Sequence, residues 1–324
     1  MLAGVASKDG LVMSDISEPR PKPNEVLVKV KAASLNRADL AVARGMPHGP
    51  NSGVGALVGI EWAGEVVETG ADVQGGHKPG DRVMCSGNGG YAEYAVADWG
   101  RVSPIPANNM TYAQAATLPV ALQTMHDALV TNGRLKEGES VLIQGASSGV
   151  GLMALQIARH KGAKLVMGTS TNAARRARLT EYGADLALDS RDPAWPERVA
   201  EATEGNGVDL IIDQVSASVA NQNMKAAAVL GRIVNVGRLG GMKGEFDFDL
   251  HALKRIDYIG VTFRTRSLEE VREIVRRMRA DLWDAVEAGK LALPIDRSFP
   301  LEEAAAAQAH MRANAHFGKI VLTV

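Results

Sequence analysis

Strand and helix patterns alternate along one continuous stretch of the sequence, and this alternation limits the fold more than any other feature. Apolar, strand-like segments occur at 140–144, 164–168, 185–188, 208–213, 232–236 and 257–263. Helical segments separate them at 151–161, 173–182, 195–203 and 217–230. Strands joined by helices pair in parallel, because the helix returns the chain to the same end of the sheet. We therefore expect an α/β Rossmann domain with a doubly wound parallel sheet at 122–264.

Short strand-like segments with glycine-rich turns lie on both sides of that region. Residues 25–31, EVLVKVK, alternate apolar and charged side chains with the period of a half-buried strand. Further short apolar runs follow up to residue 97, and residues 319–322 form another. Such spacing is typical of a barrel or sandwich. The sequence therefore predicts a β domain made of 1–121 and 265–324, with the α/β domain inserted into it.

The composition argues against several other classes of protein. The net charge is −1 and aromatic residues make up 4% of the chain, so no nucleic acid and no membrane is expected as a partner. Cys85 is the single cysteine, which excludes an internal disulfide and a multi-cysteine metal site. Residues 1–10 lack a signal-peptide pattern, and the apolar stretch 113–130 is too polar to span a bilayer. We expect a cytoplasmic protein.

The segment after the strand 140–144 has the composition of a dinucleotide-binding turn. It consists of small residues: Gly145, Ala146, Ser147, Ser148, Gly149, Val150 and Gly151. Small side chains let the backbone approach a pyrophosphate, whose charge the free N–H groups of the first helical turn can receive. Ala146 and Ser148 replace two glycines of the Gly-x-Gly-x-x-Gly pattern, but a strand, a helix and a second strand surround the turn as expected. We therefore expect a bound dinucleotide rather than a tight turn without a ligand.

The end of the second strand indicates which dinucleotide binds. An NAD enzyme has a carboxylate there, which holds the ribose hydroxyls and repels a 2′-phosphate. This sequence instead has hydroxyl side chains and then a guanidinium: Thr169, Ser170, Thr171 and Arg175. These groups can hydrogen-bond to a 2′-phosphate, so the sequence predicts NADPH as the cofactor. Arg175 shares its predicted helix with Arg176 and Arg178, and these arginines could instead form the solvated face of that helix.

Short motifs are distributed along nearly the whole chain. In order they are Asn36-Arg37-Ala38-Asp39, Gly59-Ile60-Glu61, Gly80-Asp81-Arg82-Val83, Gly90-Tyr91-Ala92-Glu93-Tyr94, Ala115-Ala116-Thr117-Leu118-Pro119, the small-residue turn and Gly318-Lys319-Ile320-Val321-Leu322. Together they resemble the medium-chain dehydrogenase/reductase superfamily, specifically its zinc-independent NADPH:quinone oxidoreductase branch, which includes zeta-crystallin. The resemblance implies a GroES-like β-barrel catalytic domain with an inserted Rossmann domain.

The resemblance also implies which residues contact the cofactor. Those at the nicotinamide end would be Asn36, Thr124, Val236, Gly237, Phe263, Arg264 and Thr265, with Asn314 closing over the cofactor. Gly149, Val150 and Gly151 would hold the pyrophosphate. Ser170 and Arg175 would take the 2′-phosphate. Ser190 stands where relatives often have a tyrosine near the adenine ribose, so the detail of 2′-phosphate recognition stays open.

The same resemblance implies that the chain binds no zinc. Zinc-dependent relatives need a thiolate and an imidazole as ligands. At the matching positions this chain has Asn36 and Ile60, and the segment after Cys85 lacks the four cysteines of a structural zinc lobe. We therefore expect no metal site.

Hydride transfer from NADPH to a quinone is the predicted reaction. The developing oxyanion needs a hydrogen-bond donor, for which Asn36 is a candidate. His126 could donate to a carbonyl oxygen or could serve only in packing. His48, in a loop rich in glycine and proline, could be a proton donor or a solvated loop residue. An enoyl or alkenal double-bond reductase of the same fold and a non-catalytic NADPH-binding protein are the alternatives.

The last strand of the predicted parallel sheet could mediate self-association. Residues 258–263 would lie at the sheet edge. Edge strands carry unpaired N–H and C=O groups, which can pair with a second copy across a two-fold axis. We therefore expect a homodimer that acts on a small-molecule quinone or enone.

Overall fold

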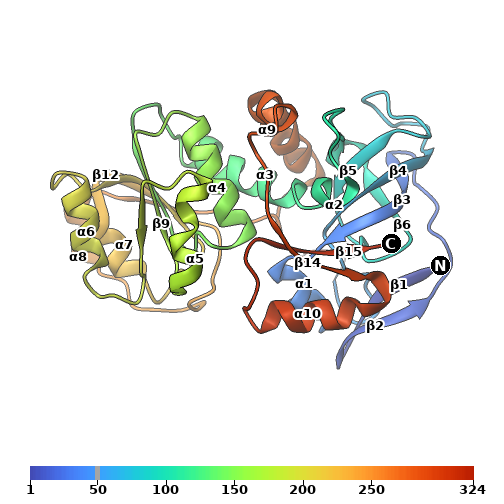
Figure 1. The fold of residues 1–324 in the computed structure, drawn as a ribbon, viewed down its shortest axis with the longest axis horizontal. Coiled ribbons are helices and arrows are strands. Elements are labelled where there is room, and N and C mark those ends of the chain that lie inside the picture. Colours follow the sequence, from blue (N-terminus) through green and yellow to red (C-terminus); the bar gives the residue numbers. More distant parts are fainter. Residues whose placement is uncertain (48–51) are drawn as a thin grey trace. The chain divides into compact units, whose positions relative to one another are not determined.

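The computed structural model describes residues 1–47 and 52–324, and it divides into two compact units (Figure 1). Unit 1 comprises Met1–Gln123 together with Phe263–Val324, and unit 2 comprises Thr124–Thr262. His48, one of the residues considered as a proton donor, lies outside the described residues. The β part of the chain thus stands on both sides of the α/β part in the sequence.

Unit 2 is built on a six-stranded parallel sheet. Its strands are β8 (Ser140–Ile143), β9 (Leu165–Thr169), β10 (Leu186–Leu188), β11 (Val208–Asp213), β12 (Ala227–Asn235) and β13 (Asp257–Gly260). They are ordered β10-β9-β8-β11-β12-β13, and every neighbouring pair is parallel. This is the strand order of a Rossmann domain, which confirms the predicted fold class.

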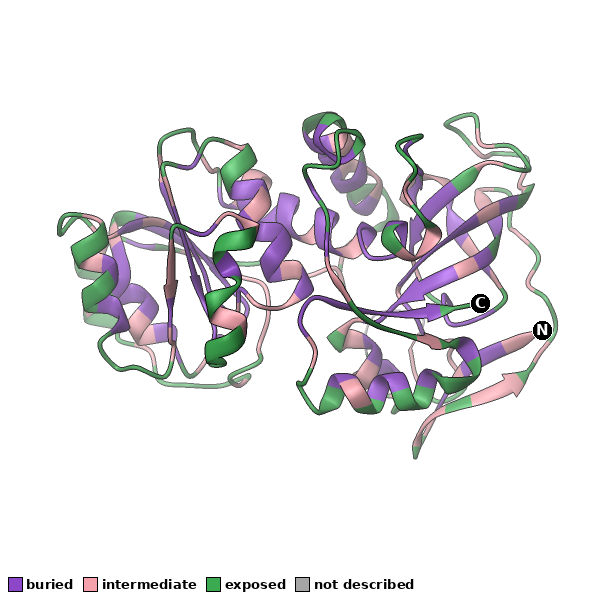
Figure 2. Cartoon of the chain, in the orientation of Figure 1, coloured by how far each residue is buried: buried purple, intermediate pink, exposed green. Residues whose placement is uncertain are grey.

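Helices cover both faces of this sheet. They are α4 (Gly149–His160), α5 (Ala173–Ala177), α6 (Trp195–Ala202), α7 (Ala220–Ala226) and α8 (Phe248–Lys254). Figure 1 shows α4 and α5 on one face and α6, α7 and α8 on the other. The central strands are buried between them, whereas the outer faces of the helices are exposed (Figure 2). Burial on both faces explains why these strands read as continuous apolar runs in the sequence.

Two helices of unit 2 differ from the sequence prediction. The helix predicted at 217–230 ends at Ala226, because residues from Ala227 onward join the sheet as β12, where Ala227 pairs with Val208. An alanine-rich segment has high helix propensity, but here strand pairing outweighs it. The helix predicted at 173–182 divides into α5 and a 3-10 helix at Leu179–Tyr182, which ends at Gly183 with φ of 99°.

Unit 1 contains a seven-stranded sheet and a hairpin. The hairpin is β1 (Leu2–Ser7) with β2 (Gly10–Asp15), and the sheet strands are β3 (Glu25–Ser34), β4 (Glu61–Thr69), β5 (Arg82–Ser86), β6 (Tyr94–Asp98), β7 (Val102–Pro104), β14 (Ile295–Pro300) and β15 (Lys319–Thr323). The order is β14-β15-β3-β4-β5-β7, and β6 also pairs with β3. Strands from both ends of the sequence therefore share one sheet.

The ends of three neighbouring strands, β15, β3 and β4, meet on one side of this sheet. Strands β4 and β15 both run antiparallel to β3, with Ala33 opposite Trp62 and Ser34 opposite Val321. The end of β3 therefore lies beside the beginnings of β4 and β15. This arrangement places Asn36, Glu61 and Lys319 together.

The helices of unit 1 are α1 (Arg37–Val42), α2 (Tyr112–Ala115), α9 (Leu268–Glu287) and α10 (Ala304–Arg312), and α3 (Pro119–His126) runs across the boundary between the units. Helix α9 is amphipathic, with Val271, Val275 and Met278 buried. Leu268, in the first turn of the helix, is 39% exposed. Within the described residues, no helix is both long and apolar enough to cross a membrane.

Candidate active site

The small-residue turn of unit 2 connects β8 to α4 and lies close to the end of β9. The Ala146 N–H donates to the Thr169 carbonyl at 2.9 Å, and the Gly145 N–H donates to the Thr169 hydroxyl at 3.0 Å. A Cβ atom at Gly151 would lie 2.7 Å from the Cα and carbonyl oxygen of Ala146. Glycine is therefore required at 151 so that the helix can approach the turn.

Helix α4 begins at Gly149, two residues before the predicted start, and directs free backbone donors toward its N-terminus. Ser148 is the N-cap, and its Oγ accepts a hydrogen bond from the Gly151 N–H at 3.1 Å. In the part of the chain that the structure describes, the N–H groups of Gly149 and Val150 have no acceptor. Of the three amides predicted to hold a pyrophosphate, two are thus available and the third stabilises the cap.

The turn lies at the point where the strand order of the sheet reverses, between β8 and β11. Gln214, directly after β11, donates from Nε2 to the Gln144 carbonyl at 3.1 Å. Its Oε1 accepts from the Ser148 hydroxyl at 3.0 Å. Crevices at such a reversal, beyond the carboxyl ends of the strands, are where open α/β sheets bind ligands.

A chain of buried hydrogen bonds supports the turn from inside the unit. The Thr169 hydroxyl donates to Gln144 Oε1 at 2.7 Å, and Gln144 Nε2 donates to Asn223 Oδ1 at 2.7 Å. Asn223 Nδ2 in turn donates to Asp213 Oδ2 at 3.0 Å, and burial raises the pKa of Asp213. Thr169 was predicted to contact the cofactor, but its side chain is fully buried and its hydroxyl is used in this network. The structure therefore gives it a supporting position.

The structure brings Ser147 and Ser170 together at the end of β9. Their Oγ atoms lie 3.0 Å apart, and the Ser170 N–H donates to the Leu188 carbonyl at 3.0 Å. Thr171 follows on the exposed surface. Two neutral hydroxyls thus occupy the position at which a carboxylate would select NAD.

The arginines of α5 differ in their surroundings. Arg176 Nη1 donates to the Ser170 carbonyl at 2.9 Å and also pairs with Asp189 at 3.1 Å. Arg175, the predicted phosphate ligand, is half-buried, and its backbone N–H donates to the Asn172 side chain at the helix N-cap. Arg178 pairs with Glu181 at 3.1 Å on the exposed face, in agreement with the interpretation of a solvated residue.

Arg176 and Asp189 are residues that sequence reasoning did not assign to the site. Asp189 directly precedes the predicted Ser190, which is partly buried. Hydrogen bonds from Arg191 lower the pKa of Asp189, so it carries a negative charge near the Ser170 backbone. The sequence signal that could have identified this ion pair is Asp189, an acidic residue directly after β10. Strand β10 pairs with β9, and α5, which carries Arg176, follows β9 in the sequence.

Val236 and Gly237 lie beside β11, at the same end of the sheet as the turn. Both N–H groups donate to the Asp213 carbonyl, at 2.8 and 3.1 Å. A Cβ atom at Gly237 would lie 2.5 Å from the Gln214 carbonyl oxygen, so this crossing needs glycine. Thr124 is partly exposed on α3, whereas His126 is 1% exposed.

In unit 1, the side chain of Asn36 contacts a buried ion pair. Its Nδ2 donates to Glu61 Oε1 at 2.8 Å, and its Oδ1 accepts from Lys319 Nζ at 3.1 Å. Lys319 also pairs directly with Glu61. Glu61 is 0% exposed and Lys319 is 3% exposed, whereas Asn36 is partly exposed. Asn36 is therefore the accessible end of a buried polar cluster.

The helix that follows Asn36 is held by a second buried carboxyl group. Asp39 Oδ2 accepts from the Asn36 N–H at 2.7 Å and from the Tyr91 hydroxyl at 2.9 Å. Burial raises the pKa of Asp39 to about 7 and that of Tyr91 well above its ordinary value. These bonds fix the start of α1 and hence the backbone of Asn36.

The remaining predicted cofactor residues also belong to unit 1. Asn314 adopts a φ of 54°, and its side-chain oxygen accepts a hydrogen bond from Arg37, the neighbour of Asn36. Phe263 is partly buried, and the two residues after it, Arg264 and Thr265, are exposed between β13 and α9.

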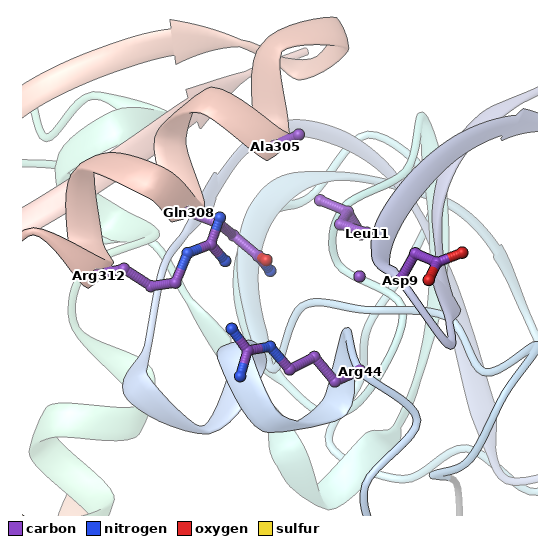
Figure 3. Close-up of a pocket in the computed structure, with 7 residues that line it drawn as sticks. Asp9, Leu11, Arg44, Ala305, Gln308 and Arg312 are labelled. Atoms are coloured by element: carbon purple, nitrogen blue, oxygen red, sulfur yellow. The ribbon is translucent and has the colours of Figure 1, made fainter.

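A surface cavity of about 230 Å³ opens elsewhere in unit 1 (Figure 3). It is lined by Asp9, Gly10, Leu11, Arg44, Ala305, Gln308 and Arg312. Figure 3 shows the guanidinium groups of Arg44 and Arg312 directed into the cavity and the Asp9 carboxylate directed away from them. None of these described lining residues is a predicted site residue. Among the residues that the structure covers, no three His, Cys, Asp or Glu side chains form a metal-binding group.

Two family models match successive parts of the chain, and the second extends from unit 2 into unit 1. A model described as alcohol dehydrogenase GroES-like domain matches residues 22–107, which lie in unit 1. A model described as zinc-binding dehydrogenase matches residues 149–280, which begin at the first residue of α4.

Individual relatives include enzymes of similar length and parts of larger ones. Quinone oxidoreductase from Rattus norvegicus is 30% identical over 323 residues, which cover 96% of this chain and 92% of the relative. The highly reducing polyketide synthase easB of Emericella nidulans is 29% identical over 312 residues, or 96% of this chain, and the chain spans only 12% of that synthase.

Solved structures show the same architecture. A mycobacterial protein in complex with NADPH has a TM-score of 0.87 and 26% identity, with all of both chains covered. The fold, the two family models and the end-to-end similarity to the rat enzyme agree with one another. The chain therefore belongs to the medium-chain dehydrogenase/reductase superfamily of oxidoreductases.

Proposed function

We propose that the chain is a zinc-independent, NADPH-dependent reductase that transfers hydride to a quinone. The observation that carries this proposal is the neutral pair Ser147 and Ser170 at the end of β9, beside the free N–H groups of Gly149 and Val150. The amides favour a pyrophosphate, and the hydroxyls leave room for a 2′-phosphate that a carboxylate would repel.

The residues of unit 2 fit the dinucleotide. When bound, NADPH supplies the hydride from C4 of its nicotinamide ring. Gly149 and Val150 hold the pyrophosphate, and Ser147, Ser170 and Arg175 bind the 2′-phosphate. Arg176 is partly neutralised by Asp189 at 3.1 Å, so it orders the Ser170 backbone and contributes less of the positive charge.

The residues of unit 1 act on the acceptor. As the family resemblance implies, Asn36 lines the nicotinamide end and donates a hydrogen bond from Nδ2 to the carbonyl oxygen that becomes negative. A quinone can take its proton from solvent, so the reaction needs no dedicated acid. If a proton donor is required, the residue to test is His126 of unit 2, which is 1% exposed. We propose a reaction without zinc because Asn36, an amide, stands where zinc-dependent relatives have a thiolate ligand.

The relatives support this assignment. The rat quinone oxidoreductase aligns with 96% of the chain, and a solved mycobacterial relative carries NADPH. The alternative is an enoyl or alkenal double-bond reductase, which the similarity to a highly reducing polyketide synthase favours. A non-catalytic NADPH-binding protein is the third reading, and it predicts binding without oxidation of the cofactor.

One experiment separates the three. Oxidation of NADPH is followed at 340 nm with a panel of quinones, enones and aldehydes, and the panel is repeated with NADH. Turnover with quinones supports the proposal, whereas turnover confined to enones supports the double-bond reductase. Tight NADPH binding without turnover by any acceptor supports the non-catalytic reading, and failure to bind either dinucleotide overturns all three.

A further inference from the structure

We propose that Glu61 and Lys319 are positioning residues that hold the Asn36 amide in a single orientation, with its nitrogen as the donor toward the acceptor substrate. This inference rests on the proposed function, in which Asn36 donates to a carbonyl oxygen. It adds two buried residues, distant in sequence from Asn36, to the machinery of the site.

The contacts distinguish the two ends of the amide. Lys319 Nζ, a donor only, lies 3.1 Å from Asn36 Oδ1, and Glu61 Oε1, an acceptor only, lies 2.8 Å from Asn36 Nδ2. A flip of the amide would place its oxygen against the carboxylate and its nitrogen against the ammonium group. Both contacts would then be repulsive, so the charges exclude the flipped form.

The ion pair itself is fixed by further contacts. Glu61 Oε2 accepts from the Val120 N–H at 2.8 Å, and Lys319 Nζ also donates to the Leu35 carbonyl at 3.1 Å. Both side chains are buried, so water does not compete for these bonds. The pair is therefore a rigid support, and only Asn36 reaches the accessible surface.

This support has two chemical consequences. First, in the part of the chain that is described, Glu61 is the only acceptor that Asn36 Nδ2 meets, which leaves its second hydrogen for a ligand. Second, the ammonium group behind Oδ1 polarises the amide and strengthens Nδ2 as a donor. Asn36 is thereby fixed as a donor to a carbonyl oxygen, which suits a quinone or enone acceptor.

The test removes the charges of Glu61 and Lys319 and then measures whether the change in kcat depends on Asn36. Removing one partner would leave a buried unpaired charge and could unfold unit 1, so the main variant is the charge-free Glu61→Gln/Lys319→Met. We expect its kcat to fall about tenfold with a nearly unchanged Kd for NADPH, because the groups proposed to hold the pyrophosphate and the 2′-phosphate lie in unit 2 and are untouched. Lys29→Met on the exposed strand surface is the matched control and should keep the wild-type kcat.

A double-mutant cycle with Asn36→Ala tests whether Glu61 and Lys319 affect kcat through Asn36. If the pair acts through Asn36, then adding Glu61→Gln/Lys319→Met to Asn36→Ala causes no further loss of kcat. Losses that multiply in the combined variant, or a charge-free variant with wild-type kcat, would overturn the proposal.

A second measurement does not depend on enzyme activity. Proton exchange at the Asn36 side-chain amide, followed by NMR, should show one protected hydrogen in the wild type and clearly weaker protection in the charge-free variant, because a neutral amide oxygen is a weaker acceptor than the Glu61 carboxylate. Equal exchange in both would refute the positioning role even if the reductase is active. If no acceptor is reduced but the protected hydrogen is present, the proposed function fails while the positioning role stands.

Discussion

The hydroxyl oxygens of Ser147 and Ser170 lie 3.0 Å apart, which joins the small-residue turn to the end of β9. An aspartate at position 170 would place a negative charge beside this contact and repel a 2′-phosphate. We predict that Ser170→Asp weakens NADPH binding by a factor of about 10–100 and leaves NADH binding unchanged or stronger. Titrations of protein fluorescence with each dinucleotide measure both constants. Ser170→Ala, which adds no charge, is the control, and an equal loss for both cofactors in Ser170→Asp would contradict the assignment.

Arg175 supplies the second prediction. A charge-assisted contact to the 2′-phosphate is worth about 1–3 kcal/mol, so Arg175→Ala should weaken NADPH by that amount and NADH much less. Arg178→Ala removes the same charge from the same segment, but Arg178 is held by Glu181 and should leave both affinities unchanged. If Arg178→Ala has the larger effect on NADPH, the phosphate lies elsewhere.

The third prediction concerns pH and Asp39. Burial raises the pKa of this carboxyl group to about 7 in the folded state, whereas an unfolded aspartate titrates near 4. Between these values the folded state binds one more proton than the unfolded state, so the stability of the fold decreases as the pH rises. The decrease is at most about 1.4 kcal/mol per pH unit.

Asp39→Asn removes this titration while keeping an oxygen that can accept from Asn36 N–H and the Tyr91 hydroxyl. Urea unfolding of both proteins from pH 4 to pH 8 should show the stability of the wild type falling relative to the variant up to about pH 7 and then remaining level. Glu61 and Lys319 also face this region, so the difference between wild type and variant is the relevant quantity. Parallel pH profiles would show that Asp39 does not titrate in this range.

The fourth prediction concerns self-association through β13. This strand lies at the end of the sheet order, and a Cβ atom added at Gly260 would have no atom within 4 Å. Gly260→Lys is therefore compatible with the folded monomer but introduces a charge at the sheet edge, which blocks strand pairing. We expect a wild-type mass of two chains in sedimentation equilibrium, one chain for Gly260→Lys, and two for Gly260→Ala. A wild-type mass of one chain would exclude the homodimer.

The parallel sheet and the small-residue turn could be predicted from the sequence because their signals are local. Strands at 140–144 and 208–213 read as apolar runs, and the turn between Gly145 and Gly151 sits directly after one of them. The segment 227–230 was misassigned because its helix propensity is local, whereas the pairing of Ala227 with Val208 is not.

The contacts around Asn36 could not be predicted in the same way. Glu61 and Lys319 stand 258 positions apart, and only the folded sheet brings the starts of β4 and β15 beside the end of β3. The contact of Arg176 with Ser170 could not be predicted either, because the sequence does not say which of Arg175, Arg176 and Arg178 turns back toward β9.

The late position of Lys319 has a consequence for the order of synthesis. A ribosome completes residues 124–262, and hence the whole of unit 2, before it reaches the lysine that neutralises Glu61. Until then the incomplete unit 1 contains the Glu61 carboxylate without the Lys319 ammonium group, and burying this unpaired charge would cost free energy. Unit 1 is therefore expected to stay open on the ribosome while unit 2 is already folded, and premature termination before residue 319 would release chains of that kind.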